Sequence, residues 1–379
     1  MGRNYLKNDS IISPLGFGTL ENLKALRNTE SALKRQKNSK IFKDGYFAGL
    51  IDNNLIDSAF RRFADPGSFT KLDKLLILAI KQVLDSSDVD PCITGLIIST
   101  TKGNIDLLGN NKYDRERIFL WKMAQVVSEF FKFQNKPVVV SNACISGALA
   151  IKTAHDLIET GRFENVIVAG GDLVSDFVLS GFQSFQAISP EPCRPFSNDR
   201  LGVSLGEAAA AILIGPDDGK DRSKIRYIDA ITANDANHIS GPSKTGEGLY
   251  QSIRRLLDHN KIDSSQIDYL SAHGTATNYN DEMESIAFNR AGLLSVPVNS
   301  FKGYYGHTLG TSALIESILT KHSLLNNELF TSLNYTSSGV SENLNVIENH
   351  NFRELDLALK TASGFGGCNL AMLLKKDRL

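Results

Sequence analysis

The amino-acid sequence predicts an α/β fold, because apolar segments of strand length alternate with segments of helical periodicity along the chain. The composition agrees with a globular protein: 42% of the 379 residues are apolar and 22% are charged. At roughly 100–200 residues per domain, this length predicts two domains or one large layered body. No apolar run reaches the roughly 18 residues that a membrane-spanning helix needs, so we expect no membrane span.

The first expected elements are two helix–strand pairs. Residues 72–84 have apolar side chains at helical spacing, and residues 95–99 (Gly-Leu-Ile-Ile-Ser) are typical of a buried strand. Residues 121–133 again have helical spacing, and 137–140 are apolar throughout. A strand without a polar face is expected to be buried on both sides.

A third pair follows. The expected helix covers 148–159 and ends before Gly161, a residue type favoured just after a helix because it accepts a positive φ. The strand over 166–171 then ends in two glycines.

The best candidate for a domain boundary is the polar, turn-rich segment 215–221. It divides the chain into halves of 1–215 and 216–379. Segments 138–157 and 296–318 both read as a strand, an asparagine, a turn of small residues and a helix. This weak similarity suggests a duplicated α/β unit.

Charge and cysteine content limit the function classes. With 41 basic and 42 acidic side chains the net charge is −1, which disfavours nucleic acid as a partner. The N-terminus lacks the apolar core of a signal peptide, so the expected location is the cytoplasm. The cysteines are too far apart for a disulfide framework or a zinc knuckle, and suit a reducing compartment: Cys92, Cys144, Cys193 and Cys368.

Cys144 follows the strand over 137–140, in a turn of small residues before a helix. The N–H groups and dipole of a helix N-terminus favour a thiolate, and small neighbours leave room for a substrate. The alternative is a buried, inert thiol, and the residues alone leave these two interpretations about even.

Two histidines and a glycine-rich loop have comparable settings. His273 in HGTAT and His307 in YYGHTLG each adjoin a glycine after an apolar run, where catalytic groups of α/β proteins collect. Phe365 lies among three glycines in Gly364–Gly367, which suits close backbone approach to a ligand. Each of these signals is weak by itself, but two such histidines together with the Cys144 turn are a combination typical of a catalytic site.

The ordered set of Cys144, His273, His307 and the Gly-Phe-Gly-Gly loop resembles the β-ketoacyl synthases of the thiolase fold. A histidine at the third position is similar to the elongating Cys-His-His branch rather than to the chain-starting Cys-His-Asn branch. Further matches are Ser13–Gly16, Arg194-Pro195-Phe196, and the acidic pair Asp281 and Glu284. The resemblance implies a thiolase-like fold, with two similar α/β halves in five αβαβα layers.

The resemblance also implies roles for single residues. Cys144 would carry the acyl group, and His273 and His307 would donate N–H groups to the enolate formed from a malonyl thioester. Lys302 and Glu316 would hold charge and orientation behind His307. The remaining implied sites are the oxyanion hole or gate at Phe365 and the substrate contacts of Thr275, Thr277 and Gly366. No metal or redox cofactor is implied.

The implied reaction is the decarboxylative condensation of a malonyl-carrier protein with an enzyme-bound acyl group, which makes the chain an acyltransferase. This chain departs from the family pattern at some positions. Ser197 and Leu201 are found where the family usually has aspartates, and residues 361–363 are Thr-Ala-Ser where the family usually has Asn-Ser-Phe. These departures leave fatty-acid synthesis and a specialised polyketide or aryl-polyene pathway both open.

The implied partners are an acyl carrier protein and a second synthase subunit. The acidic carrier is expected to dock at basic residues that cluster before and within one helix, at positions similar to the family's docking site: Arg61, Arg62, Lys71 and Lys74. The alternative is a solvated helix face without a partner. The strand over 137–140 is expected near the interface of a dimer, either with itself or with a related subunit.

Two other functions stay open. A Cys-His hydrolase or simple acyltransferase would leave the second histidine and the Lys302–Glu316 pair without a role. A non-catalytic subunit that sets chain length beside an active synthase typically lacks the nucleophile.

Overall fold

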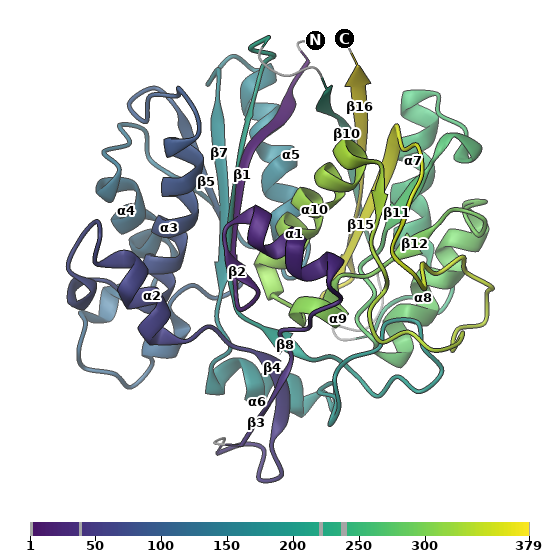
Figure 1. Cartoon of the computed structure of the whole chain (residues 1–379), viewed down its shortest axis with the longest axis horizontal. Coiled ribbons are helices and arrows are strands. Elements are labelled where there is room, and N and C mark those ends of the chain that lie inside the picture. Colours follow the sequence, from purple (N-terminus) through teal and green to yellow (C-terminus); the bar gives the residue numbers. More distant parts are fainter. Residues whose placement is uncertain (1–2, 38–39, 220–222, 236–240, 379) are drawn as a thin grey trace.

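Helices and sheets alternate in five layers across the molecule (Figure 1). The computed structural model describes residues 3–37, 40–219, 223–235 and 241–378. From left to right in Figure 1 lie outer helices, one half of the sheet, two central helices, the other half of the sheet, and a second group of outer helices. The five-layered arrangement expected from the sequence is confirmed.

The strands of the two halves pair in the same order. In each half the outermost strand is parallel to the second, the second is parallel to the third, and the two remaining neighbours are antiparallel. The N-terminal half runs β6 (Val138–Val140), β5 (Gly95–Ser99), β7 (Val166–Asp172), β9 (Ala208–Gly215), β1 (Tyr5–Ser13). The C-terminal half runs β12 (Val298–Asn299), β11 (Tyr269–Ser271), β15 (Leu357–Gly364), β16 (Cys368–Arg378), β10 (Ser223–Asn234).

The repeat extends to the helices that follow the outermost strands. After β6 comes α5 (Ser146–Glu159). After β12 come the short helix α9 (Lys302–Tyr305), a 3-10 turn and then α10 (Ser312–Asn326). The two helices pack against each other in the central layer. An added Cβ at Gly147 in the first turn of α5 would lie 2.4 Å from the backbone N of Leu314 on α10. Glycine therefore lets the two helices approach closely beside the site.

The outer helices cover the other face of each half. On the N-terminal side these are α2 (Asn53–Phe60), α3 (Lys71–Asp85) and α4 (Leu120–Phe130), and on the C-terminal side α7 (Glu247–Asn260) and α8 (Asn278–Arg290). Each helical layer has its own apolar core, and the central core draws residues from both halves.

Shorter elements complete the fold. The helices are α1 (Thr19–Arg27), α6 (Asp176–Ser184) and α9 (Lys302–Tyr305), with 3-10 turns at Pro66–Ser68, Ile105–Leu107, Arg115–Ile118, Ser264–Gln266 and Leu309–Thr311. The short strands are β2 (Gly16–Phe17), β3 (Lys34–Gln36), β4 (Tyr46–Gly49), β8 (Leu205–Gly206), β13 (Glu328–Leu329) and β14 (Asn351–Phe352). Within the described ranges, no helix has both the length and the apolar character to cross a membrane.

The expected helices and strands are found within a few residues of their predicted bounds. One expectation about burial is not met by the single chain: Val138, Val139 and Val140 are only half-buried. The reason is that β6 is the outermost strand of its half and has a strand neighbour on one side only. The boundary segment lies between β9 and β10, with residues 220–222 outside the described residues, and the division at 215/216 stays a prediction.

Candidate active site

Cys144 lies in the sharp turn between β6 and α5. Ala143 before it has a φ of 43°, and the hydroxyl of Ser146 accepts from the Asn142 N–H (2.8 Å) and donates to the Ala143 carbonyl (2.6 Å). A positive φ at alanine is strained, and this strain points to function. Burial raises the pKa of the Cys144 thiol to about 12, although the nearby ammonium of Lys302 lowers it. The expected thiolate stabilisation by the helix N-terminus is therefore outweighed by burial, and the resting group is a thiol.

His307 faces this thiol, with Nε2 2.9 Å from Sγ. Its backbone N–H donates to the Ser204 carbonyl (2.7 Å), and its own carbonyl accepts from the Gly206 N–H (3.0 Å). These bonds to β8 and the residue before it hold the backbone of His307 in place. The Leu309 N–H donates to Nδ1 (3.1 Å). Burial, and then the Lys302 ammonium, hold the pKa of His307 well below its ordinary value. The neutral ring therefore carries its hydrogen on Nε2, which donates toward Cys144.

His273 approaches the same point from the loop after β11, at right angles to His307 with ring centroids 5.2 Å apart. The Lys302 ammonium lies 3.2 Å from Nδ1 and also donates to the His273 carbonyl. Because an ammonium has only donors, Nδ1 must accept and Nε2 must carry the hydrogen. Burial, and then Lys302, hold the pKa of His273 well below its ordinary value. Both imidazoles are thus neutral N–H donors.

The carboxylates of Glu284 and Asp281 accept hydrogen bonds from the backbone of the HGTAT turn. Glu284 accepts from the N–H groups of His273 (2.8 Å) and Gly274 (2.6 Å), and Asp281 accepts from Thr275 (2.9 Å). Burial and the neighbouring Asp281 raise the pKa of Glu284 to about 7. The acidic pair noted in the sequence therefore positions the His273 turn rather than reaching the cavity.

A buried cluster of three charges lies behind His273. The ammonium of Lys302 is 2.7 Å from Oε1 of Glu316, and that of Lys360 is 2.7 Å from Oε2. This corrects one expectation from the sequence: Lys302 contacts His273 and not His307, because α9 places its side chain under the HGTAT turn. Lys360 had no signal in the sequence, since it lies in the strand Leu357–Gly364 without any recognisable motif around it.

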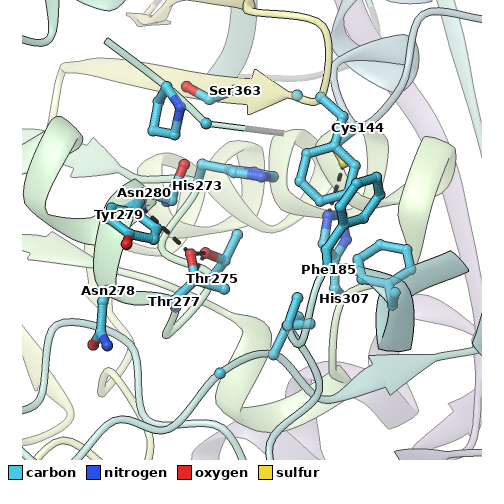
Figure 2. A pocket seen from close by; sticks show the side chains of 18 of the residues that line it. Cys144, Phe185, His273, Thr275, Thr277, Asn278, Tyr279, Asn280, His307 and Ser363 are labelled. Carbon is cyan, nitrogen blue, oxygen red and sulfur yellow. Dashed lines mark hydrogen bonds between the residues drawn. The ribbon is translucent and has the colours of Figure 1, made fainter. Parts of the chain in front are cut away.

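Cys144 and the two histidines line a cavity of about 410 Å³. Figure 2 shows the side chains that surround it. Thr275 and Thr277, whose hydroxyls are 2.8 Å apart, line one side together with Tyr279, and Phe365 lines another. Phe365 contacts the rings of Phe182 and Phe185, with centroids 5.5 and 5.3 Å away. These two phenylalanines were not predicted, because α6 has no motif that relates it to the site.

Glycines let the Phe365 loop approach the nucleophile. A Cβ at Gly364 would lie 2.8 Å from Sγ of Cys368 and 3.1 Å from the backbone N of Cys144. Gly366, predicted to contact substrate, is not among the cavity-lining residues, and its φ of 90° instead serves the turn. Cys193 and Cys368 are buried outside the His–Cys contact and Cys92 is exposed.

Cys144, His273 and His307 bring three potential metal-ligating atoms within 4.8 Å of one another. Both Nδ1 atoms accept hydrogen bonds, so the hydrogens on Nε2 occupy the positions that a metal would need. The adjacent Lys302 ammonium would also repel a cation. The donor set therefore suits an anion, not a metal ion.

The four predicted carrier-docking residues divide into two kinds. Arg61 and Arg62 are exposed. Lys71 instead pairs with Glu207 (2.6 Å) and Lys74 with Asp57 (2.5 Å). The two lysines hold α3 to its neighbours, so their charges are already compensated within the chain.

Comparison with family models shows which family the chain belongs to. Residues 10–218 match the model described as "Beta-ketoacyl synthase, N-terminal domain", and residues 227–336 match "Beta-ketoacyl synthase, C-terminal domain". The chain belongs to the β-ketoacyl synthase family. Its Cys-His-His cluster is thus found in the setting that the sequence resemblance implied.

Relatives of this β-ketoacyl synthase family member match it over nearly its whole length. It is 26% identical to the putative mitochondrial 3-oxoacyl-[acyl-carrier-protein] synthase of Schizosaccharomyces pombe, covering 96% of this chain and 97% of the relative. It is also 26% identical to 3-oxoacyl-[acyl-carrier-protein] synthase 2 of Rhizobium meliloti, covering 99% of both. A ketosynthase solved in complex with its chain length factor from Xenorhabdus doucetiae has the same thiolase-like fold, with a TM-score of 0.85, 23% identity and coverage of 99% and 98%.

Proposed function

We propose that the protein catalyses the decarboxylative condensation of a malonyl-carrier protein with an acyl group held on Cys144, giving a 3-oxoacyl-carrier protein. The observation that carries this proposal is the convergence of two neutral imidazole N–H donors on one thiol. A hydrolase needs a histidine that accepts a proton, and here both rings are held as donors.

The first half-reaction transfers the acyl group to sulfur. The Cys144 sulfur attacks the thioester carbonyl, and the pantetheine sulfur leaves as the C–S bond breaks. The thiol proton moves to the departing sulfur, so no net base is consumed. The backbone N–H groups of Cys144 and Phe365 would stabilise the oxyanion, and one such donor is typically worth roughly 10²–10³ in rate.

The second half-reaction forms the carbon–carbon bond. Malonyl thioester enters, its carboxylate leaves as CO₂, and the bonding electrons form an enolate whose charge lies on the thioester oxygen. His273 and His307 donate to that oxygen. The enolate carbon then attacks the carbonyl of the acyl-cysteine, and the C–S bond breaks. The Cys144 thiolate that leaves takes one proton from solvent and returns to the resting thiol. Thr275 and Thr277, at the cavity wall, would bond the pantetheine arm.

We infer that the carrier is an acyl carrier protein and that the subunit acts as a dimer. The curated relatives are named for acyl-carrier-protein substrates, and the Xenorhabdus ketosynthase was solved in complex with its chain length factor. Among the described strands, the half-buried, apolar β6 pairs only with β5, which leaves its other edge suited to a second copy or to such a partner. Arg61 and Arg62 are the exposed basic residues proposed for carrier docking.

Incubation with acyl- and malonyl-carrier protein, followed by intact-mass analysis, tests the function. A condensing enzyme gives an acylated protein and an elongated carrier-bound product. A hydrolase gives free acid, and a non-catalytic subunit gives neither an acylated protein nor an elongated product. Either of these two outcomes contradicts the proposal. Varying the acyl group in the same assay separates fatty-acid from specialised polyketide substrates.

A further inference from the structure

Lys360 is a fully buried lysine in the middle of β15. Its neighbours two residues away, Ala358 and Ala362, belong to the central apolar core, so Lys360 faces the same layer. The small alanines leave space for a long side chain that reaches Glu316 on α10. A lysine at such a position costs desolvation energy, which a purely packing role does not require.

The Lys360 ammonium contacts Glu316 and the backbone just before His273. Its ammonium is 2.7 Å from Oε2 of Glu316 and donates to the carbonyls of Ser271 (3.3 Å) and Ala272 (3.4 Å), the two residues before His273. A third bond joins its own neighbour, the Thr361 carbonyl (2.5 Å). Lys360 thus holds the backbone segment that leads into His273.

The charges in this cluster do not balance. Burial lowers the pKa of Lys360, and the adjacent Glu316 carboxylate opposes this shift. With both ammonium groups protonated, Lys302 and Lys360 carry two positive charges against one negative charge on Glu316, so one positive charge remains. The other acidic group near it, Glu284, has a pKa raised to about 7 by burial and by Asp281, and is therefore partly neutral near pH 7. The surplus charge acts on His273 from the Nδ1 side, through Lys302.

We propose that Lys360 is a positioning residue for the condensation: with Lys302 it clamps both oxygens of Glu316, and it keeps a positive charge behind His273 where decarboxylation creates an enolate. This inference rests on the proposed function. The charge matters most in the step where the malonyl carboxylate departs as CO₂ and its negative charge moves to the enolate oxygen. Acyl transfer to Cys144 depends on it less, because its oxyanion lies at the backbone donors.

Lys360→Met keeps the length of the side chain and removes its charge. We expect CO₂ release from malonyl-carrier protein to fall about 10- to 100-fold, while acylation of Cys144 changes less than about threefold. The matched control is Lys376→Met, since Lys376 is also a buried strand lysine but bonds only the Leu324 carbonyl and the Asn327 side chain. That control should keep both half-reactions.

A second readout is independent of activity. Lys360 is one of the charges that lower the pKa of His273, after burial, Lys302 and His307. In Lys360→Met the NMR titration midpoint of His273 should therefore move upward toward the ordinary value, and in Lys376→Met it should not. A merely structural role would change stability without moving this midpoint.

The outcomes separate two failures. If the unaltered protein releases no CO₂, the proposed function fails, and the His273 titration still tests the charge of Lys360. If folded Lys360→Met releases CO₂ at the unaltered rate, or if His273 titrates as before, the inference is overturned. Should Lys360→Met not fold, Lys360→Gln replaces it, because an amide keeps donors for the carbonyls without the charge.

Discussion

Replacing Cys144 with alanine removes the nucleophile and leaves both imidazole donors in place. Acyl transfer and elongation should be abolished, while some decarboxylation of malonyl thioester survives, because that step needs only the enolate donors. His307→Ala should remove decarboxylation and spare much of the acylation, and His273→Ala should behave likewise. Protein mass reports acylation and released CO₂ reports decarboxylation. Elongated product from Cys144→Ala would contradict the assignment.

The protonation state of Cys144 gives a pH prediction. Its pKa is raised by burial to about 12, so the thiolate is a minor species at neutral pH. The alkylation rate of this residue should therefore rise about tenfold per pH unit up to about pH 10, without levelling off. Peptide mapping after brief iodoacetamide treatment measures Cys144 separately from the exposed Cys92. A plateau near pH 8 would show that the helix N-terminus outweighs burial.

Residues with local motifs could be predicted from the sequence, and residues defined by packing could not. Cys144, His273 and His307 each stand beside glycine or other small residues at the end of an apolar run, and that pattern is visible in a few letters. Which histidine Lys302 contacts depends on how α9 lies under another loop. Lys360 and Glu316 are on different elements, so neither sequence segment reveals the pair.

At the scale of elements, the close packing of α5 on α10 can be tested at Gly147. An added methyl group would meet the backbone of Leu314, which cannot move like a side chain end. Gly147→Ala should lower the free energy of unfolding by about 1–3 kcal/mol and reduce acylation, since this turn also carries Cys144. Gly181→Ala on α6 is the control, because its Cβ would meet nothing within 4 Å. Equal stability of both variants would refute the close contact.

The elements themselves were largely predictable, because their hydrophobic periods are strong. Helix α3 has ten buried positions and a Thr70–Asp73 capping box, and β5 is buried from end to end. The exposure of β6 could not be predicted, since its three valines look the same in a central strand and in an edge strand that awaits a partner. Hydrophobic periodicity could not predict the small sheet of β3, β4 and β8, because each of these strands is too short to show an alternating pattern. Within this sheet, β8 bonds the backbone of His307.

At the scale of the whole molecule, we expect a dimer through the β6 edge. Multi-angle light scattering at micromolar concentration should give twice the mass of the 41.5 kDa chain. Backbone amides of Val138–Val140 should exchange hydrogen more slowly at high protein concentration than after dilution, because pairing protects them. A stable monomer at micromolar concentration, or exchange independent of concentration, would contradict this interface.

The central layer also determines when the chain can finish folding. The inner face of the N-terminal half, with Ala210 and Ile212, belongs to a core that α10 completes from the other half. A ribosome makes the N-terminal strands long before α10, so this apolar surface stays incompletely covered while the rest of the chain is synthesised. Protection by chaperones therefore matters most during that interval, and release of the finished chain coincides with closure of the core beside Cys144.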